Sequence, residues 1–257
     1  MKIKKIIPAF FLVAFLAFAL EGIPQDITAL LMEAKRLEQS KKENDAFKKY
    51  LEVLVLQPGN MVALCKASEL CSMIGNRQIQ KSSKLDYFNA ARGYAASALK
   101  INSNFPEANF VMSLAMGRLA LVLNGKEKIL AVNDIKKYAE KVVRIDPSNF
   151  KAFHVLGKWH YEISSLSSIT KMGAKIIFGG LPPSSFSESI KFYEKSRALN
   201  PDFALNYLEV AKAYHKNDQD KRAIKILRKL QTIPEKNSDD PLIQQEGKQL
   251  LKELRGT

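Results

Sequence analysis

The chain repeats one spacing of apolar and small residues, and this repetition constrains its fold more than any other feature. In residues 43–60 the spaced residues are Ala46, Tyr50, Val53 and Pro58, separated by four, three and five positions. The same separations recur in three further stretches, residues 91–105, 132–149 and 186–203. Spacings of three and four place side chains on one face of an α-helix. The repetition therefore predicts an array of similar helices.

A second pattern follows Pro147 and Pro201. In each case two large residues three positions apart are followed directly by a small residue and, three positions later, by another large one. The two sets are Phe153, Leu156, Gly157 and His160, and Tyr207, Val210, Ala211 and Tyr214. The small residue lets a partner helix approach closely while the large residues pack around it. Together the two patterns are those of the tetratricopeptide repeat (TPR), a helix pair of about 34 residues.

We predict an all-α fold, a TPR-like superhelix, because no sustained alternation of apolar and polar residues follows Pro24. About five helix pairs are expected, near residues 27–60, 61–105, 106–149, 150–203 and 204–237, with a capping helix at 239–255. Three repeats exceed the usual length, and we expect their extra residues between the paired helices, around 74–83, 122–132 and 162–184. Residues 27–257 are thus expected to form one helical-repeat domain.

The start of the chain has the pattern of a secretory signal peptide. Three lysines precede an apolar run over residues 6–19, which ends in Ala17-Phe18-Ala19, the small residues that signal peptidase reads. This run of about 14 residues is shorter than the roughly 20 that span a bilayer as a helix. We therefore predict a signal peptide at 1–19, a linker at 20–26 and, for a bacterial chain, export to the periplasm. An uncleaved membrane anchor is the alternative.

The motifs of common enzymes and metal sites are absent from the sequence. The three histidines, His154, His160 and His215, have no acidic or cysteine neighbours at metal-ligand spacing. Cys65 and Cys71 are six residues apart on one expected helix, about 9 Å along its axis, which is too far for a disulfide. No phosphate-binding loop, nucleophile elbow or zinc-protease motif occurs. We predict a protein that is not an enzyme and has no cofactor.

Residues 157–203 carry a narrower likeness. Trp159 and Tyr161-Glu162 close one helix, a short amphipathic insert ends in Phe178-Gly179-Gly180-Leu181-Pro182-Pro183, and a Ser-rich helix start leads to an Asn200-Pro201 turn. This stretch resembles the regulator of microtubule dynamics protein family, and the likeness extends over about 30–255. The resemblance implies a TPR-like superhelix and, for some members, association with microtubules, or with membranes and lipid transfer between them. It assigns no role to individual residues of this chain.

In a TPR superhelix the first helix of each pair lines the concave face. The positions next to the packing residues around each first helix are expected to form this face, and they carry a mixture of apolar, aromatic and basic groups. The residues are Phe110, Leu114, His154, Lys158, Tyr161, Leu208, Lys212 and His215. The face is either a partner-binding surface or an ordinary solvated surface with some packing between helices.

The insert of the fourth repeat is a second candidate surface. Its residues Lys171, Met172, Lys175, Ile176 and Phe178 combine apolar and basic side chains. Such a stripe suits either packing over the repeat or contact with acyl chains and anionic head groups. We favour packing, because exposed large apolar groups invite aggregation. The insert lies in the most basic stretch, residues 77–180, which has 16 Lys and Arg against 7 Asp and Glu.

The leading functional hypothesis is a non-catalytic, exported TPR scaffold that binds a protein or peptide partner through its concave face. The alternative is a lipid-binding or membrane-surface carrier that contacts anionic lipid. Microtubule association is a further alternative, with tubulin a partner only if the chain is cytosolic. Nucleic acid is not expected as a partner, because no recognised binding module appears.

Overall fold

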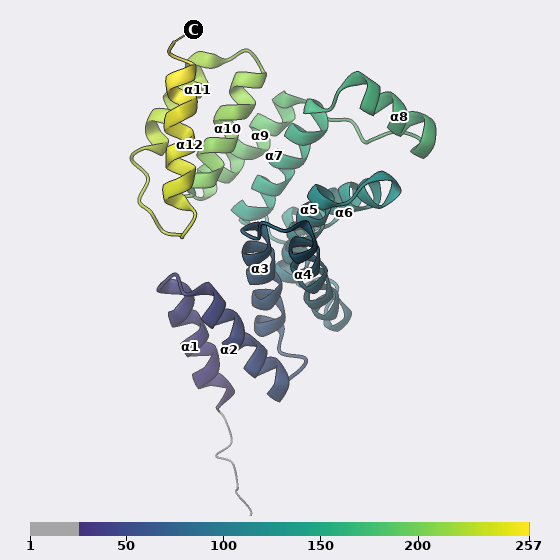
Figure 1. Cartoon of the computed structure of the whole chain (residues 1–257), viewed down its shortest axis with the longest axis vertical. Coiled ribbons are helices and arrows are strands. Elements are labelled where there is room, and N and C mark those ends of the chain that lie inside the picture. The colour runs from purple at the N-terminus through teal and green to yellow at the C-terminus, as the bar shows by residue number, and fades with distance from the viewer. Residues whose placement is uncertain (1–25, 257) are drawn as a thin grey trace, which may run out of the picture.

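The computed structural model describes residues 26–256 apart from the side chains of residues 177 and 178, and the regular elements of this part are all helices (Figure 1). They are α1 Ile27–Gln39, α2 Glu43–Leu56, α3 Met61–Asn76, α4 Lys81–Ile101, α5 Pro106–Val122, α6 Gly125–Ile145, α7 Phe150–Ser165, α8 Ser168–Phe178, α9 Phe186–Leu199, α10 Ala204–Lys216, α11 Asp220–Leu230 and α12 Asp240–Glu253. The expected signal peptide and nearly all of the expected linker lie outside the described residues.

Consecutive helices pack as pairs, so the expected all-α, TPR-like architecture is confirmed. The pairs are α1 with α2, α3 with α4, α5 with α6, α7 with α9, and α10 with α11. Helix α12 packs against both helices of the last pair, as a cap does. Figure 1 shows the pairs following one another along a curved path from α1 to α12.

An Asn or Asp follows the second helix in three of the pairs and helps to end it. Asn102, Asp146 and Asn200 each follow the second helix of a pair, and each side chain accepts a hydrogen bond from the backbone N–H two residues later, at 3.0–3.1 Å. Such Asx turns stop a helix and redirect the chain. Helices α3 and α7 each begin after an N-cap residue. The side chains of Asn60 and Asn149 accept a hydrogen bond from the backbone N–H three residues later.

The repeated spacing marks the buried faces of the second helices. All three helical positions of the pattern are buried in α2, α4, α6 and α9. At Gly157 of α7, a Cβ atom would lie 2.6 Å from the ring of Tyr193 in α9. The small position of the pattern is therefore needed for the close approach of α7 and α9.

The extra residues of the second and third repeats lie mostly inside helices, which differs from the expected interhelical insertions. Only residues 77–80 separate α3 from α4, and only 123–124 separate α5 from α6. Helices α4 and α6 instead reach 21 residues each. Neither helix contains an internal proline to end it, so the added residues extend the hydrogen-bonded ladder. The insertion near 162–184 does separate a pair, because it contains α8 and the turn that follows.

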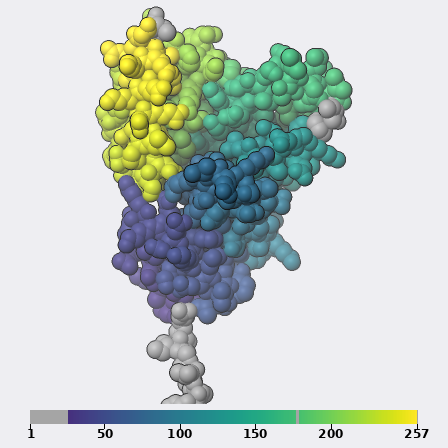
Figure 2. Space-filling model, viewed as in Figure 1, coloured from purple at the N-terminus to yellow at the C-terminus, as the bar shows by residue number. Residues whose placement is uncertain are grey.

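The two ends of the described array meet. Arg77, at the end of α3, donates from Nε to Asp239 Oδ1 at 2.9 Å and pairs with Glu43 at the start of α2. Asp239 immediately precedes α12, and Figure 2 shows α12 against the first helices. The array thus curves far enough to bring its cap back to its second and third helices. None of the described helices has both the length and the apolar character needed to cross a bilayer.

Candidate functional site

The first helices of the pairs, α1, α3, α5, α7 and α10, form a continuous surface that we call the inner face. Helix α5 packs against both α3 and α7, and α7 packs against α10. Beside their apolar packing, these helices carry two carboxylates with little solvent exposure, Glu69 and Glu209, and each pairs with two lysines. The inner face is therefore a polar surface held in place by ion pairs.

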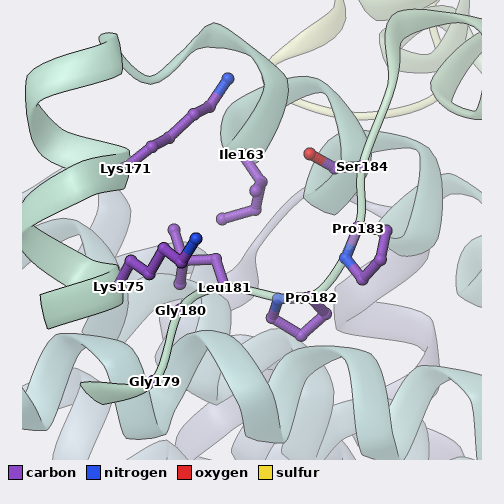
Figure 3. Close-up of a pocket in the computed structure, with 9 residues that line it drawn as sticks. All are labelled: Ile163, Lys171, Lys175, Gly179, Gly180, Leu181, Pro182, Pro183 and Ser184. Carbon is purple, nitrogen blue, oxygen red and sulfur yellow. The ribbon is translucent and has the colours of Figure 1, made fainter.

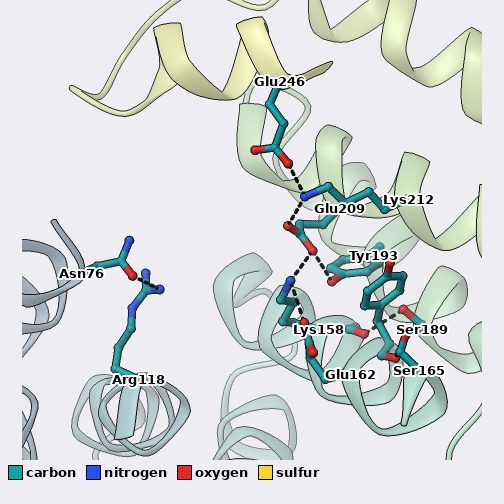
Figure 4. A network of polar contacts seen from close by, with 12 residues as sticks. Asn76, Arg118, Lys158, Glu162, Ser165, Ser189, Tyr193, Glu209, Lys212 and Glu246 are labelled. Atoms are coloured by element: carbon teal, nitrogen blue, oxygen red, sulfur yellow. Dashed lines mark hydrogen bonds and ion pairs between the residues drawn. The ribbon is translucent and has the colours of Figure 1, made fainter. Parts of the chain in front are cut away.

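Glu209 of α10 centres the first cluster, which Figure 4 shows. Its carboxylate accepts from Lys158 Nζ at 2.7 Å and from Lys212 Nζ at 3.3 Å. Lys212 continues to Glu246 of α12 at 2.7 Å, and Lys158 to Glu162 at 3.0 Å. Burial alone would raise the pKa of Glu209, but the two lysines outweigh it and hold the pKa below its usual range. Glu209 is therefore ionised at neutral pH and fixes both lysines.

Glu69 of α3 centres the second cluster. It receives Lys151 Nζ of α7 at 2.6 Å and Lys66 Nζ at 3.2 Å, and Lys66 also reaches Glu38 of α1 at 2.9 Å. Burial opposes ionisation of Glu69, yet the paired lysines lower its pKa to about 2. In the same region burial raises the pKa of Glu107. This cluster ties α1, α3 and α7 together across the array.

His154 serves the packing of the inner face. Its Nδ1 lies 2.9 Å from Oδ1 of Asn206, and its ring lies against those of Tyr193 and Phe203. Burial lowers the pKa of His154 to about 4, so the imidazole is neutral at neutral pH. His154 thus fills space between α7, α9 and α10 and carries no charge toward a partner.

The structure separates the eight expected concave-face residues into two groups. Phe110 and Leu208 are only 4% and 1% exposed, so they are core residues and not parts of an accessible surface. The aliphatic chain of Lys151 brings its Nζ to 5.0 Å from the Phe110 ring centroid, and Leu208 belongs to the core cluster of the last repeats. The remaining six are partly exposed, namely Leu114, His154, Lys158, Tyr161, Lys212 and His215.

Several charged residues of the inner face were missed by sequence reasoning, among them Glu69, Glu209, Arg118 and the lysines of the Glu69 cluster, Lys66 and Lys151. Glu69 and Glu209 were missed because acidic residues on a basic chain read as ordinary solvated positions. Arg118 continues the four-residue spacing of Phe110 and Leu114 along α5, and this spacing was a usable signal. Burial of the two carboxylates, by contrast, depends on helices far apart in the chain.

Helix α8 stands out from the array and exposes an apolar stripe. Ile169, Met172 and Ile176 are 79%, 59% and 79% exposed, which corrects the expectation that the insert packs its large apolar groups over the repeat. The small Ala174 packs inward instead. Helix α8 is one short amphipathic helix of 11 residues, so only one side of it can be covered. The side chain of Phe178 lies outside the described part of the structure.

A cavity of about 380 Å³ lies between α8 and the turn that follows it (Figure 3). Lys171 and Lys175 line one side, Ile163 of α7 lies behind them, and residues 179–184 close the other side. Lys171 Nζ donates to the carbonyl oxygen of Ser164 at 3.0 Å. Lys175 makes no ion pair within residues 26–256. The cavity therefore combines an apolar floor with two basic groups.

The described residues offer little for catalysis or metal binding. No group of three or more His, Cys, Asp or Glu side chains in residues 26–256 is arranged to hold a metal ion. Cys65 and Cys71 are buried free thiols, and burial raises the pKa of each to about 12. Such thiols stay protonated and are poor nucleophiles.

Known proteins match this chain in sequence and in fold. The family model described as regulator of microtubule dynamics protein 1-3 matches residues 30–255. Regulator of microtubule dynamics protein 1 of Mus musculus is 24% identical over 88% of this chain and 74% of its own length. The protein of that name from Bos taurus is 26% identical over 74% of this chain, and mouse regulator of microtubule dynamics protein 3 is 20% identical over 88%. The chain spans 59% and 49% of the lengths of these last two relatives.

Two solved structures share the fold at low identity. A thermophilic TPR protein of Thermus thermophilus superposes with a TM-score of 0.65 over 87% of this chain and all of that chain, at 12% identity. A tetratricopeptide repeat protein from Parabacteroides merdae superposes with a TM-score of 0.53 over 91% of this chain and 76% of that chain, at 15% identity. At these identities the likeness concerns the arrangement of helices alone.

Proposed function

Because the chain belongs to the regulator of microtubule dynamics protein 1-3 family and folds as a TPR-like array, we propose that it is a non-catalytic scaffold that binds a protein or peptide partner through its inner face. Stacked helix pairs create an extended concave surface, and repeat proteins of this kind use such surfaces for binding. The ion-paired inner face is the observation that carries the proposal.

The inner face suits binding because its charged side chains are already ordered. Lys158 and Lys212 are held by Glu209, and Lys66 and Lys151 by Glu69. Ordering a long side chain at an interface costs about 0.5–1.5 kcal/mol, and these ion pairs reduce that cost before the partner arrives. Half-buried Leu114 and Tyr161 add apolar and aromatic contact area beside the charges. The combination fits an extended segment with both apolar and polar groups.

Site-specific photo-crosslinking tests the proposal. A benzophenone amino acid is placed at Tyr161 or His215 on the inner face and, as matched controls, at Lys191 of α9 or Lys225 of α11, residues of the second helices. Partner adducts are expected from the inner positions and at least fivefold fewer from the controls. Equal adducts from both sets would contradict the proposal. Charge reversal of Lys158 and Lys212 is a poorer test, because it would surround buried Glu209 with negative charge.

Export is part of the same proposal, and residues 1–19 are its support. Mass spectrometry of the protein recovered from its native cell measures the first residue. Cleavage after Ala19 is expected, with recovery from the periplasmic fraction if the source is a bacterium. A chain that retains residue 1 and fractionates with membranes would indicate an anchor instead.

A membrane-surface or lipid-carrying role is the second candidate, favoured by α8. The exposed Ile169, Met172 and Ile176 lie next to the cavity that Lys171 and Lys175 line. Apolar groups flanked by lysines are typical of helices that lie on anionic bilayers. Tubulin binding is supported only by the names of the relatives and requires a cytosolic chain.

Vesicle co-sedimentation separates this candidate from the scaffold. The variant I169S/I176S is compared with V55S/I79S, which removes two apolar groups that are at least as exposed from elsewhere on the surface. Binding to vesicles containing phosphatidylserine is expected to fall only in I169S/I176S and to weaken with salt. Equal binding by both variants, or none by the unmodified chain, would rule out a role for α8 in binding these membranes.

A further inference from the structure

The two ends of the array meet through charged side chains and not through packed helices. We call this contact the seam: Arg77 of α3 donates to Asp239 at 2.9 Å and pairs with Glu43 of α2. Helix α12 packs closely on α10 and α11, and among the described helices it has no comparable packing with α2 or α3. Arg77 and Asp239 are 35% and 43% exposed, so water can replace their pairing at little cost. The seam can therefore open without disturbing an apolar core.

Helix α12 is fixed to the last pair by its middle. Gly247 approaches α11 so closely that a Cβ atom there would lie 2.4 Å from the Leu230 side chain. The next anchor is Glu246, which pairs with Lys212 of α10 at 2.7 Å. Asp239, by contrast, makes no N-cap hydrogen bond with α12, so its carboxylate serves the seam alone. The start of α12 is therefore the part of the cap whose position depends on the seam.

With the seam closed, the centre of the inner face is covered. Arg118 of α5 lies at this centre, and its Nε is buried. Burial lowers the pKa of Arg118, and the negative charges of Asp239 and Glu209 oppose that shift. Because charges exert such an influence only over short distances, the start of α12 and the middle of α10 both lie near Arg118. Figure 4 shows Arg118 with Asn76 on one side and the Glu209 cluster on the other.

We propose that the contact of Arg77 with Asp239 is a latch that keeps bulky groups from the centre of the inner face until it opens. The inference rests on the proposed scaffold function, because the latch regulates binding only if the inner face is where a partner binds. Small groups reach the centre in the closed state, whereas a peptide enters after the start of α12 has moved away from α2 and α3. The apparent affinity for such a partner is then reduced in proportion to the open fraction.

Reaction rates of a reporter thiol with maleimides of two sizes test the latch. The reporter is Leu114→Cys at the centre of the inner face, and Ser97→Cys on the exposed side of α4 is its control. The reagents are N-ethylmaleimide and a maleimide that carries a long polyethylene glycol chain. The native thiols of Cys65 and Cys71 are buried, which raises the pKa of each to about 12, so they react slowly with both reagents.

With the latch intact, the polymer reagent is expected to react far more slowly with L114C than with S97C, while the small reagent discriminates much less. Arg77→Ala and Asp239→Asn should each raise the polymer rate at L114C about threefold to fivefold and change the rate of the small reagent by less than about twofold. Asp239→Glu keeps the charge and should leave both rates as they are. Arg92→Ala, which removes an exposed arginine of α4, should do the same. The rates at S97C should not respond to any of these variants.

Other outcomes overturn the inference. If the polymer reagent reacts with L114C as readily as with S97C while the latch is intact, the seam covers nothing. If R77A and D239N leave the polymer rate unchanged, the seam does not control access. If they accelerate both reagents equally, the seam supports helix packing and is not a latch. These measurements need no partner, so their failure is distinct from failure of the scaffold proposal, which crosslinking at Tyr161 tests.

Discussion

At the scale of single residues, close helix approach makes Gly157 a point of high sensitivity. A Cβ at this position meets the Tyr193 ring at 2.6 Å, whereas a Cβ at Gly117 of α5 meets nothing within 4 Å. Gly157→Ala is therefore expected to lower the free energy of unfolding by about 1–3 kcal/mol. Gly117→Ala is expected to raise it by roughly 0.5–1 kcal/mol, because alanine favours the helix. Urea denaturation measures both, and a stabilising G157A would contradict the packing described for α7 and α9.

Glu69 gives the inner face a defined pH dependence. Its folded pKa of about 2 lies below the value near 4.3 of an unfolded glutamate. A lowered folded pKa stabilises the protein above the unfolded pKa, and the stabilisation is lost as the pH falls through the folded pKa. Glu69→Gln is expected to cost about 1–3 kcal/mol at pH 7 and progressively less between pH 5 and pH 2.

Glu162→Gln is the control for this pH dependence. Glu162 also pairs with a lysine, Lys158, but its side chain is 51% exposed. An exposed pair of this kind contributes well under about 1 kcal/mol. Thermal unfolding followed across pH should show a gap between E69Q and the unmodified chain that closes in acid. A constant gap would mean that Glu69 acts through its shape and not through its charge.

At the scale of elements, the periodic residues predicted the helix pairs because the information is local. Ala46, Tyr50 and Val53 lie on one face of α2 wherever that helix packs. The turn chemistry of Asn102 and Asn200 is equally local. The outward projection of α8 is not, because an apolar stripe beside lysines has the same sequence whether it packs on the repeats or faces away from them. Sequence reasoning favoured packing, but three large apolar side chains of α8 are exposed.

Helices α8 and α12 are expected to differ in what their removal costs. Helix α7 packs directly against α9, so replacing residues 167–183 with a short Gly-Ser linker is expected to lower Tm by only a few degrees. Truncation after residue 237 removes α12, whose Gly247 approaches Leu230 of α11 so closely that a Cβ would lie 2.4 Å from its side chain. Loss of a terminal cap exposes the core of the last repeat. Calorimetry should show the larger loss for the truncation, and the reverse order would contradict these assignments.

At the scale of the whole molecule, the ion pairs between residues far apart in the chain could not be predicted from the sequence. The Lys151–Glu69 and Arg77–Asp239 pairs join residues 82 and 162 positions apart. Each depends on the curvature that all intervening repeats produce together, and small changes in helix packing angle accumulate along an array. The arrangement of charged side chains on the inner face is therefore a property of the assembled array. The placing of Leu114 and Arg118 on one face of α5, by contrast, follows from the spacing within that helix. This is why Leu114 was found from its spacing and Glu209 was not.

Arg77 is expected to set the curvature of the array without contributing much to its stability. Hydrogen bonds to Glu43 and Asp239 raise its pKa, but the side chain is 35% exposed, and partly exposed ion pairs are worth about 1 kcal/mol or less. Arg77→Ala should therefore leave Tm within a few degrees while releasing α12 from α2 and α3. Spin labels on K48C and K248C, positions of α2 and α12, report the separation of these ends. The native thiols are buried and react slowly.

The expected result is a longer and broader distribution of distances in R77A than in the unmodified chain or in R92A, a variant of an exposed arginine on α4. High salt should shift the unmodified chain in the same direction, because it screens the exposed part of the pairing. If R77A keeps the narrow distribution, helix packing alone sets the curvature. In that case the contact of Arg77 with Asp239 is a consequence of the curved array and not one of its causes.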